Sequence, residues 1–150
     1  MKRKKYGWVL VIACIFAMLV PNVFAQTEQP LMLKVTVIVA SNQGSEFTMD
    51  NDNYRDELVK LFSYKSYKQV KDYLVELLPA ENELLNIEGG YMLALNSEGE
   101  KDGKFLVRMV IQKDGRQFLN TEITVTGEVP VFMGGPSVQN GVLILAVEKR

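Results

Sequence analysis

The chain has 150 residues, with 17 basic and 18 acidic side chains, one cysteine, one tryptophan and no histidine. Without histidine, the Ser-His-Asp and Cys-His arrangements of nucleophilic catalysis are excluded, because each needs an imidazole to take a proton from the nucleophile.

The first 25 residues are typical of a cleavable secretory signal peptide. Residues 2–5 are all basic, and residues 8–20 carry no charge. Val23 and Ala25 occupy the −3 and −1 positions of a cleavage site, which predicts cleavage after Ala25 and a mature chain that begins at Gln26. The uncharged run is short for a permanent anchor, since a spanning helix needs about 20 apolar residues. We therefore expect membrane contact only through the precursor's signal segment.

Lipid attachment at Cys14 is a second interpretation, because residues 11–14 fit the loose form of a lipid-attachment box. Only residues 6–10 precede that box, whereas the apolar region of a signal usually has about 7–15 residues. The residues after Cys14 are also apolar, where a lipoprotein would continue with a polar tether. The spacing favours cleavage after Ala25, and lipidation of Cys14 stays open.

Cleavage after Ala25 removes four of the 17 basic residues and none of the 18 acidic ones, which leaves a net charge of −5. This charge argues against nucleic-acid binding, which normally shows a basic surface. Trp8 and Cys14 are lost as well, so the mature chain has neither a disulfide nor the usual ligands of zinc, copper or haem sites. We expect no cofactor, and either carboxylate or lysine chemistry or no catalysis.

Residues 26–150 suit a single domain. Residues 31–40 alternate and are rich in β-branched side chains, which predicts a central, mostly buried strand. The polar residues 41–53 predict a loop, and Tyr54, Leu58, Leu61 and Phe62 have the spacing of a short amphipathic helix, capped by Asp52 or Asn53. We expect the helix to pack on the strand face that carries Leu31, Leu33, Val35, Val37 and Val39.

Residues 66–78 fit two templates. Val70, Tyr73 and Leu74 belong to a helical stripe that continues to Leu77 and Leu78, whereas alternate residues from Tyr67 fit one face of a strand. Periodicity favours the helix slightly, and both interpretations stay open.

Five strands are predicted after Gly89, separated by turns rich in glycine. With the strand at 31–40 they make an α+β domain, mainly an antiparallel sheet of about six strands with one or two helices. The five later strands are expected at residues 91–95, 105–111, 118–126, 129–133 and 142–147.

Residues 63–68 repeat Ser-Tyr-Lys. A Ser–Lys nucleophile pair is conceivable, but neither serine has the Ser-x-x-Lys spacing. Tyrosines offer flat amphipathic surface and lysines a positive rim, so the segment is better interpreted as a partner contact. The candidate contact residues are Tyr64, Lys65, Tyr67 and Lys68.

Three further patterns resemble binding or catalytic sites. Residues 50–53 place carboxylates two apart as in an EF-hand loop, but Arg55 and Leu61 stand where the glycine and the bidentate glutamate belong, which favours an Asx-rich turn. The glycine pairs at 89–90 and 134–135 precede strand-like or turn sequence and are interpreted as turns rather than phosphate loops. A catalytic carboxylate pair could come from the glutamates at positions 81, 83, 88, 98 and 100, which are otherwise surface charges.

Two segments carry a resemblance. Residues 61–67, Leu-Phe-Ser-Tyr-Lys-Ser-Tyr, and residues 129–136 with 140–147 resemble segments of a group of uncharacterised short exported bacterial proteins. The C-terminal segment is also similar to the stretch of outer-membrane secretins that reads Val-Pro-x-x-Gly before a final apolar strand. Neither resemblance implies a catalytic residue.

Together these observations predict a non-catalytic periplasmic or envelope domain that binds an envelope protein partner, as in a secretion-related assembly. An exposed sheet edge is the expected docking element, since an unpaired edge strand accepts another strand. The alternatives are a small carboxylate-dependent hydrolase and a ligand carrier with a pocket between helix and sheet.

Overall fold

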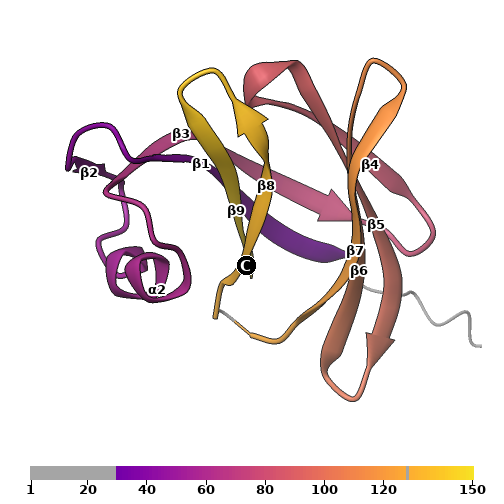
Figure 1. Cartoon of the computed structure of the whole chain (residues 1–150). Coiled ribbons are helices and arrows are strands. Elements are labelled where there is room, and N and C mark those ends of the chain that lie inside the picture. The colour runs from indigo at the N-terminus through magenta and orange to yellow at the C-terminus, as the bar shows by residue number, and fades with distance from the viewer. Residues whose placement is uncertain (1–29, 128) are drawn as a thin grey trace, which may run out of the picture.

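The computed structural model describes residues 30–127 and 129–150, in which two β-sheets face each other (Figure 1). The predicted signal peptide (residues 1–25) and the cleavage site between Ala25 and Gln26 lie outside the described residues. Within the described part, no helix is long and apolar enough to cross a membrane. The elements in chain order are β1 (Leu31–Ser41), β2 (Phe47–Thr48), α2 (Tyr54–Leu61), β3 (Ser66–Leu77), β4 (Asn82–Ile87), the 3-10 turn η2 (Glu88–Gly90), β5 (Tyr91–Lys101), β6 (Lys104–Lys113), β7 (Arg116–Val125), β8 (Val131–Val138) and β9 (Gly141–Lys149).

One sheet has the strand order β2-β3-β1-β9-β8, and the other has the order β4-β5-β6-β7. Neighbouring strands are antiparallel, except that the short β2 runs parallel to β3. β1 is central, as its sequence predicts, because β3 and β9 pair with its two sides. The chain passes from one sheet to the other between β3 and β4, and returns between β7 and β8.

The expectation of a mainly antiparallel α+β domain is confirmed, but the expected strand number of about six is too low. The described residues form nine strands in two sheets, with a single α-helix. The expected number left out β2 and β4, and also β3, for which helix and strand both stayed open. β2 has only two residues, and β4 places Leu84 on its solvent side with 58% exposure, so neither shows a clear alternation of apolar and polar residues.

Residues 66–78, for which helix and strand stayed open, form the strand β3, which ends at Leu77. β3 pairs with β1 over the whole length of β1, and this pairing satisfies backbone groups on both strands. The apolar residues of the helical stripe do not share an environment: Leu77 is buried, whereas Leu74 is 68% exposed. Pairing with a distant strand therefore outweighs a slight local preference for helix.

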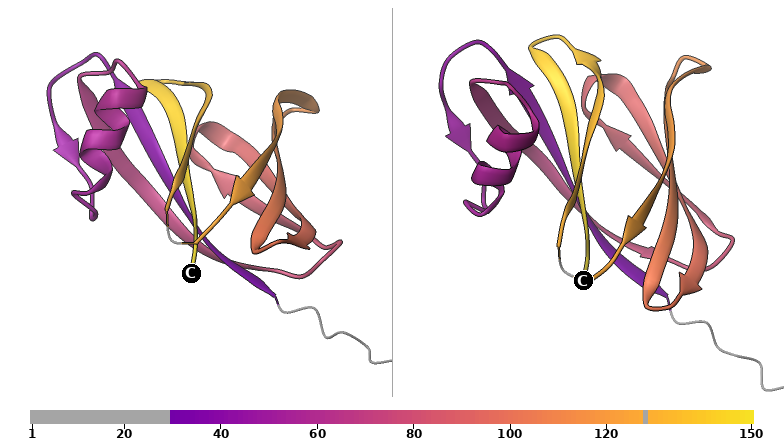
Figure 2. Two further views of the ribbon diagram at one scale, coloured as in Figure 1. Left: turned by 90° about the horizontal axis from the view of Figure 1, so that it is seen from below. Right: turned by 60° about the horizontal axis from the view of Figure 1, so that its bottom comes forward.

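The core between the sheets contains the β1 face that carries Val37, together with side chains of β5, β6 and β9. The predicted packing of this face on the helix is therefore wrong. α2 lies on the opposite side of the five-stranded sheet (Figure 2), where Leu58 packs with Ile38 and Ala40. Leu61, expected at the helix interface, is 55% exposed. The opposite face of β1 also carries buried apolar residues, Ile38 and Ala40, so the apolar face with Val37 was not the only one able to pack on the helix.

Val37→Ala is expected to lower the free energy of unfolding by about 1–3 kcal/mol, because it removes buried methyl groups and leaves a cavity. Val37 is 1% exposed. Urea denaturation of the two proteins measures the difference. Val59→Ala is the control, since Val59 is 57% exposed on α2. An unchanged midpoint for Val37→Ala would contradict the core assignment.

Candidate functional site

The outer edge of β3 is covered only at its beginning. β2 pairs with Tyr67 and Lys68. At Gln69 the loop before α2 takes over: the backbone N–H of Asp50 donates to Gln69 Oε1 at 3.1 Å, and Gln69 Nε2 donates to Asp50 Oδ2 at 2.9 Å. From residue 70 to 77, β3 pairs with β1 on one side and with no described strand on the other. The outward N–H and C=O groups of this stretch can pair with another chain.

The open edge begins with features that limit uncontrolled pairing. The register between β1 and β3 shifts at Val70, which forms a bulge. Lys71 follows, with its Nζ 4.5 Å from the centre of the Tyr73 ring. Bulges and lysines are common on natural edge strands because they discourage aggregation. The regular part of the edge is therefore residues 72–77.

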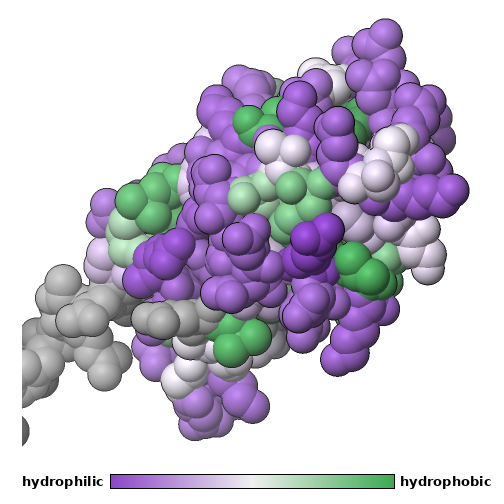
Figure 3. Space-filling view, turned by 90° about the vertical axis from the view of Figure 1, so that its left-hand side faces the viewer, coloured by the Kyte–Doolittle hydropathy of each residue, from purple (hydrophilic) through white to green (hydrophobic). Residues whose placement is uncertain are grey.

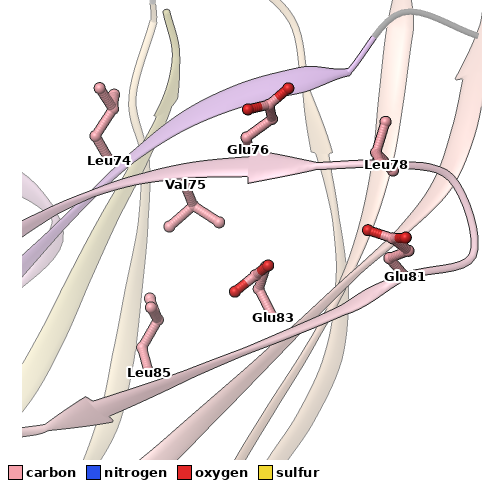
Figure 4. A pocket seen from close by; sticks show the side chains of 7 residues that line it. All are labelled: Leu74, Val75, Glu76, Leu78, Glu81, Glu83 and Leu85. Carbon is pink, nitrogen blue, oxygen red and sulfur yellow. The ribbon is translucent and has the colours of Figure 1, made fainter.

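A groove lies beside this regular part, between β3 and β4. The two strands diverge from the turn that joins them, and Val75 points from β3 toward the side of Glu83 (Figure 4). Leu74 and Glu76 lie on the other side of the β3 ribbon in the same view. The groove has a volume of about 430 Å³ and is open to solvent rather than enclosed. Its lining residues are Leu74, Val75, Glu76, Leu78, Glu81, Glu83 and Leu85.

Both ends of the groove are fixed by hydrogen bonds. At one end, the Tyr73 hydroxyl donates to the backbone carbonyl of Asn86 in β4. At the other end, the backbone N–H of Glu81 donates to the Leu78 carbonyl at 3.1 Å, and Asn96 Nδ2 donates to the Glu81 carbonyl at 3.1 Å. These contacts tie β3 and the turn to the second sheet, so the two walls of the groove keep a defined separation.

The charge of the groove is negative. Glu76, Glu81 and Glu83 line it without any lysine or arginine. Among the described residues, none of these three glutamates takes part in an ion pair; the pairs nearest in sequence join Lys34 to Asp72 and Arg108 to Glu98. Of the glutamates considered for a catalytic pair, the structure thus brings Glu81 and Glu83 to one groove.

The other candidate glutamates lie elsewhere. Glu98 is bound to Arg108 at 2.8 Å, Glu88 lines a separate pocket, and Glu100 is exposed on β5. A carboxylate pair that hydrolyses a glycosidic bond needs its acid member held protonated, commonly in an apolar site. Glu81 is exposed and Glu83 only half-buried in an open groove, which suits binding better than this chemistry.

The four predicted contact residues do not form one exposed patch. Tyr67 is 2% exposed and belongs to the core under α2, so its ring is not available to a partner. Tyr64 is half-buried against it, with ring centroids 6.4 Å apart. Lys65 and Lys68 are exposed. The hypothesis that the tyrosines bind a partner fails for Tyr67, because alternation along β3 turns this residue inward.

The loop considered for calcium uses its polar side chains within the protein. Asn51 Oδ1 accepts a hydrogen bond from the backbone N–H of Asn53 at 3.1 Å, which is an Asx turn, and Asp50 binds Gln69. Asn53 is the N-cap of α2, as predicted, but its side chain makes no capping hydrogen bond. In the part of the chain that the structure describes, no group of three or more acidic side chains is placed to hold a metal ion.

A buried polar cluster that the sequence did not indicate lies between α2 and the sheet. Tyr54, Thr36 and Glu148 are each at most 5% exposed. The Tyr54 hydroxyl and Thr36 Oγ1 have no hydrogen-bond partner among the described residues, and Glu148 Oε1 lies 2.8 Å from the guanidinium of Arg150. Burial, and then the neighbouring Glu148, raise the pKa of Tyr54 to about 12. The phenol is therefore neutral at physiological pH.

The face on the α2 and β2 side offers no broad apolar surface. Figure 3 shows it as mainly hydrophilic, with separate small apolar patches. Single exposed apolar residues are normal on protein surfaces and do not by themselves indicate an interface. The edge of β3 with its groove is therefore the site for which the structure gives the most specific geometry.

No family model, no curated protein and no solved structure matches the chain.

Proposed function

We propose that this protein is a non-catalytic binding module of the periplasm or cell envelope, which holds an envelope protein by adding one strand of that protein to β3. The observation that supports the proposal is the regular edge at residues 72–77, which no described strand covers and which lies beside a fixed groove. Main-chain hydrogen bonds supply affinity in this mode of recognition, and side-chain pockets beside the edge supply specificity.

The export part of the proposal rests on the signal pattern of residues 1–25. The alternative of a carboxylate hydrolase has one observation in its favour, the presence of Glu81 and Glu83 in one groove. The openness of that groove supports binding instead, because a hydrolytic carboxylate pair needs its acid member held protonated in an apolar environment, and Glu81 is exposed.

Site-specific photo-crosslinking in the producing cell tests the proposal. A benzoylphenylalanine at Leu74, on the open edge, is expected to give a discrete adduct with an envelope protein. The same group at Leu61 is the matched control, since Leu61 is 55% and Leu74 68% exposed. Both positions tolerate a larger side chain because they face solvent. Equal adducts at the two positions, or an adduct at Leu61 alone, would contradict docking on β3.

A further inference from the structure

An added strand would meet two kinds of surface at the β3 edge. It would lie about 4.8 Å from β3 and turn alternate side chains to the two faces of the sheet. One face looks into the groove, toward Glu81 and Glu83. The other face adjoins Leu74 and Glu76.

The groove carboxylates favour cations on the added strand. Glu76, Glu81 and Glu83 line the groove and have no cationic partner among the described residues. A lysine or arginine beside Glu81 and Glu83 is attracted by these carboxylates, whereas an acidic strand is repelled by them.

The leucines of the site favour apolar residues beside those cations. Leu74 is 68% and Leu78 39% exposed, although both line the groove. Covering them removes apolar surface from water, which stabilises the complex. The long stems of lysine and arginine also cover apolar surface while their charged ends reach a carboxylate.

A second copy of this chain does not supply such a strand. In an antiparallel pair of β3 strands centred on Asp72, the two Asp72 side chains lie opposite each other. A pair centred on Leu74 places Asp72 opposite Glu76. A pair centred on Tyr73 avoids these contacts but sets Asp72 against Leu74 and gives Glu76 no cation. Each of these registers also brings two acidic grooves to one interface.

We infer that the partner contributes an extended segment in which lysine or arginine alternates with apolar residues, its cations turned toward Glu81 and Glu83 in the groove and its apolar residues toward the face that carries Leu74. This inference rests on the proposed docking at β3 and names the chemistry of the docked strand. The regular edge together with Lys71, residues 71–77, spans about 23 Å, so a segment of about seven residues matches it.

Binding of three synthetic peptides to the purified protein tests the inference. The first alternates valine and lysine over seven residues, the second alternates valine and glutamate, and the third is the first peptide with two internal prolines. The valine-lysine peptide is expected to bind about tenfold more tightly than either of the others, and less tightly as salt is added. Amide hydrogen exchange at residues 71–77 is expected to slow when it binds.

Matched charge variants locate the cation contacts. The double variant Glu81→Gln, Glu83→Gln is expected to weaken binding of the valine-lysine peptide about tenfold. The double variant Asp56→Asn, Glu57→Gln changes the net charge equally on the exposed face of α2 and is expected to bind as the unmodified protein does.

The outcomes separate the inference from the proposed function. If the valine-glutamate peptide slows exchange at residues 71–77 equally well, the charge inference is overturned and docking on β3 stands. If none of the peptides changes exchange there, both are overturned. If residues 71–77 are protected without peptide and the mass of the protein doubles with concentration, the occupant is a second copy and the inference is again overturned.

Discussion

Tyr67→Ala is expected to lower the free energy of unfolding by about 3–5 kcal/mol, the range for truncation of a large buried aromatic side chain. Tyr67 is 2% exposed beneath α2. Its hydroxyl donates to the Phe62 carbonyl at 2.6 Å and accepts from the backbone N–H of Tyr64 at 3.3 Å. The substitution thus removes both a core ring and the hydrogen bonds that hold the end of α2. Urea denaturation followed by circular dichroism measures the loss.

Two control variants separate the ring of Tyr67 from its hydroxyl and from its neighbour. Tyr67→Phe keeps the ring and leaves the Phe62 carbonyl without this donor, at a cost of about 1–3 kcal/mol. Tyr64→Ala removes a half-buried ring and is expected to cost less than Tyr67→Ala. If Tyr67→Ala leaves the midpoint unchanged while partner binding is lost, Tyr67 is a contact residue after all.

Gly141→Ala is expected to cost about 3 kcal/mol or more, because the added methyl group overlaps backbone that has little room to move. A Cβ at this position would lie 2.1 Å from the carbonyl oxygen of Ala40, at a φ of +157°. Ala40 lies in β1 and pairs with Val142 of β9, so relief of the overlap requires the two central strands to separate locally. The midpoint of urea denaturation checks the effect.

Gly103→Ala is the matched control for the glycine effect. Gly103 has a φ of +73°, but a Cβ there meets nothing within 4 Å. Its substitution is expected to cost only the backbone strain of a left-handed residue, about 1–2 kcal/mol. If the two alanine variants lose equal stability, the overlap with Ala40 is relieved in some other way and the argument for Gly141 fails.

Local sequence predicted those elements whose pattern is strong over several residues. The alternation in residues 31–40 correctly indicated the central strand, and the glycine-containing turns between β5 and β6 and between β6 and β7 correctly indicated two hairpins. Gly134 and Gly135, interpreted as a turn, lie instead within β8. The sequence did not indicate that the strands divide into two sheets, since that division depends on contacts between distant residues. β3 shows the difficulty most clearly. Residues 66–77 form a strand because they pair with β1, and β1 lies outside any short stretch of sequence around them.

The sequence predicted the kind of candidate site, an exposed sheet edge, but not which residues come together there. An exposed sheet edge was expected, and Glu81 and Glu83 were among several acidic residues considered. Their convergence depends on the divergence of β3 and β4, which the Tyr73 contact to Asn86 and the turn at residues 78–81 set. The Ser-Tyr-Lys repeat led to a wrong prediction for Tyr67, because an aromatic ring that suits an interface also suits a core.

The pairing of β1 with β9 joins the first described strand to the last. Residues 33–40 pair with residues 142–149. This pairing brings together two segments that are separated by nearly the whole domain. Such distant pairing makes folding slow compared with chains of local contacts. β9 is synthesised after all the other described strands, and until then one side of β1 has no partner. Until β9 has formed, the unpaired edge of β1 is expected to be prone to aggregation.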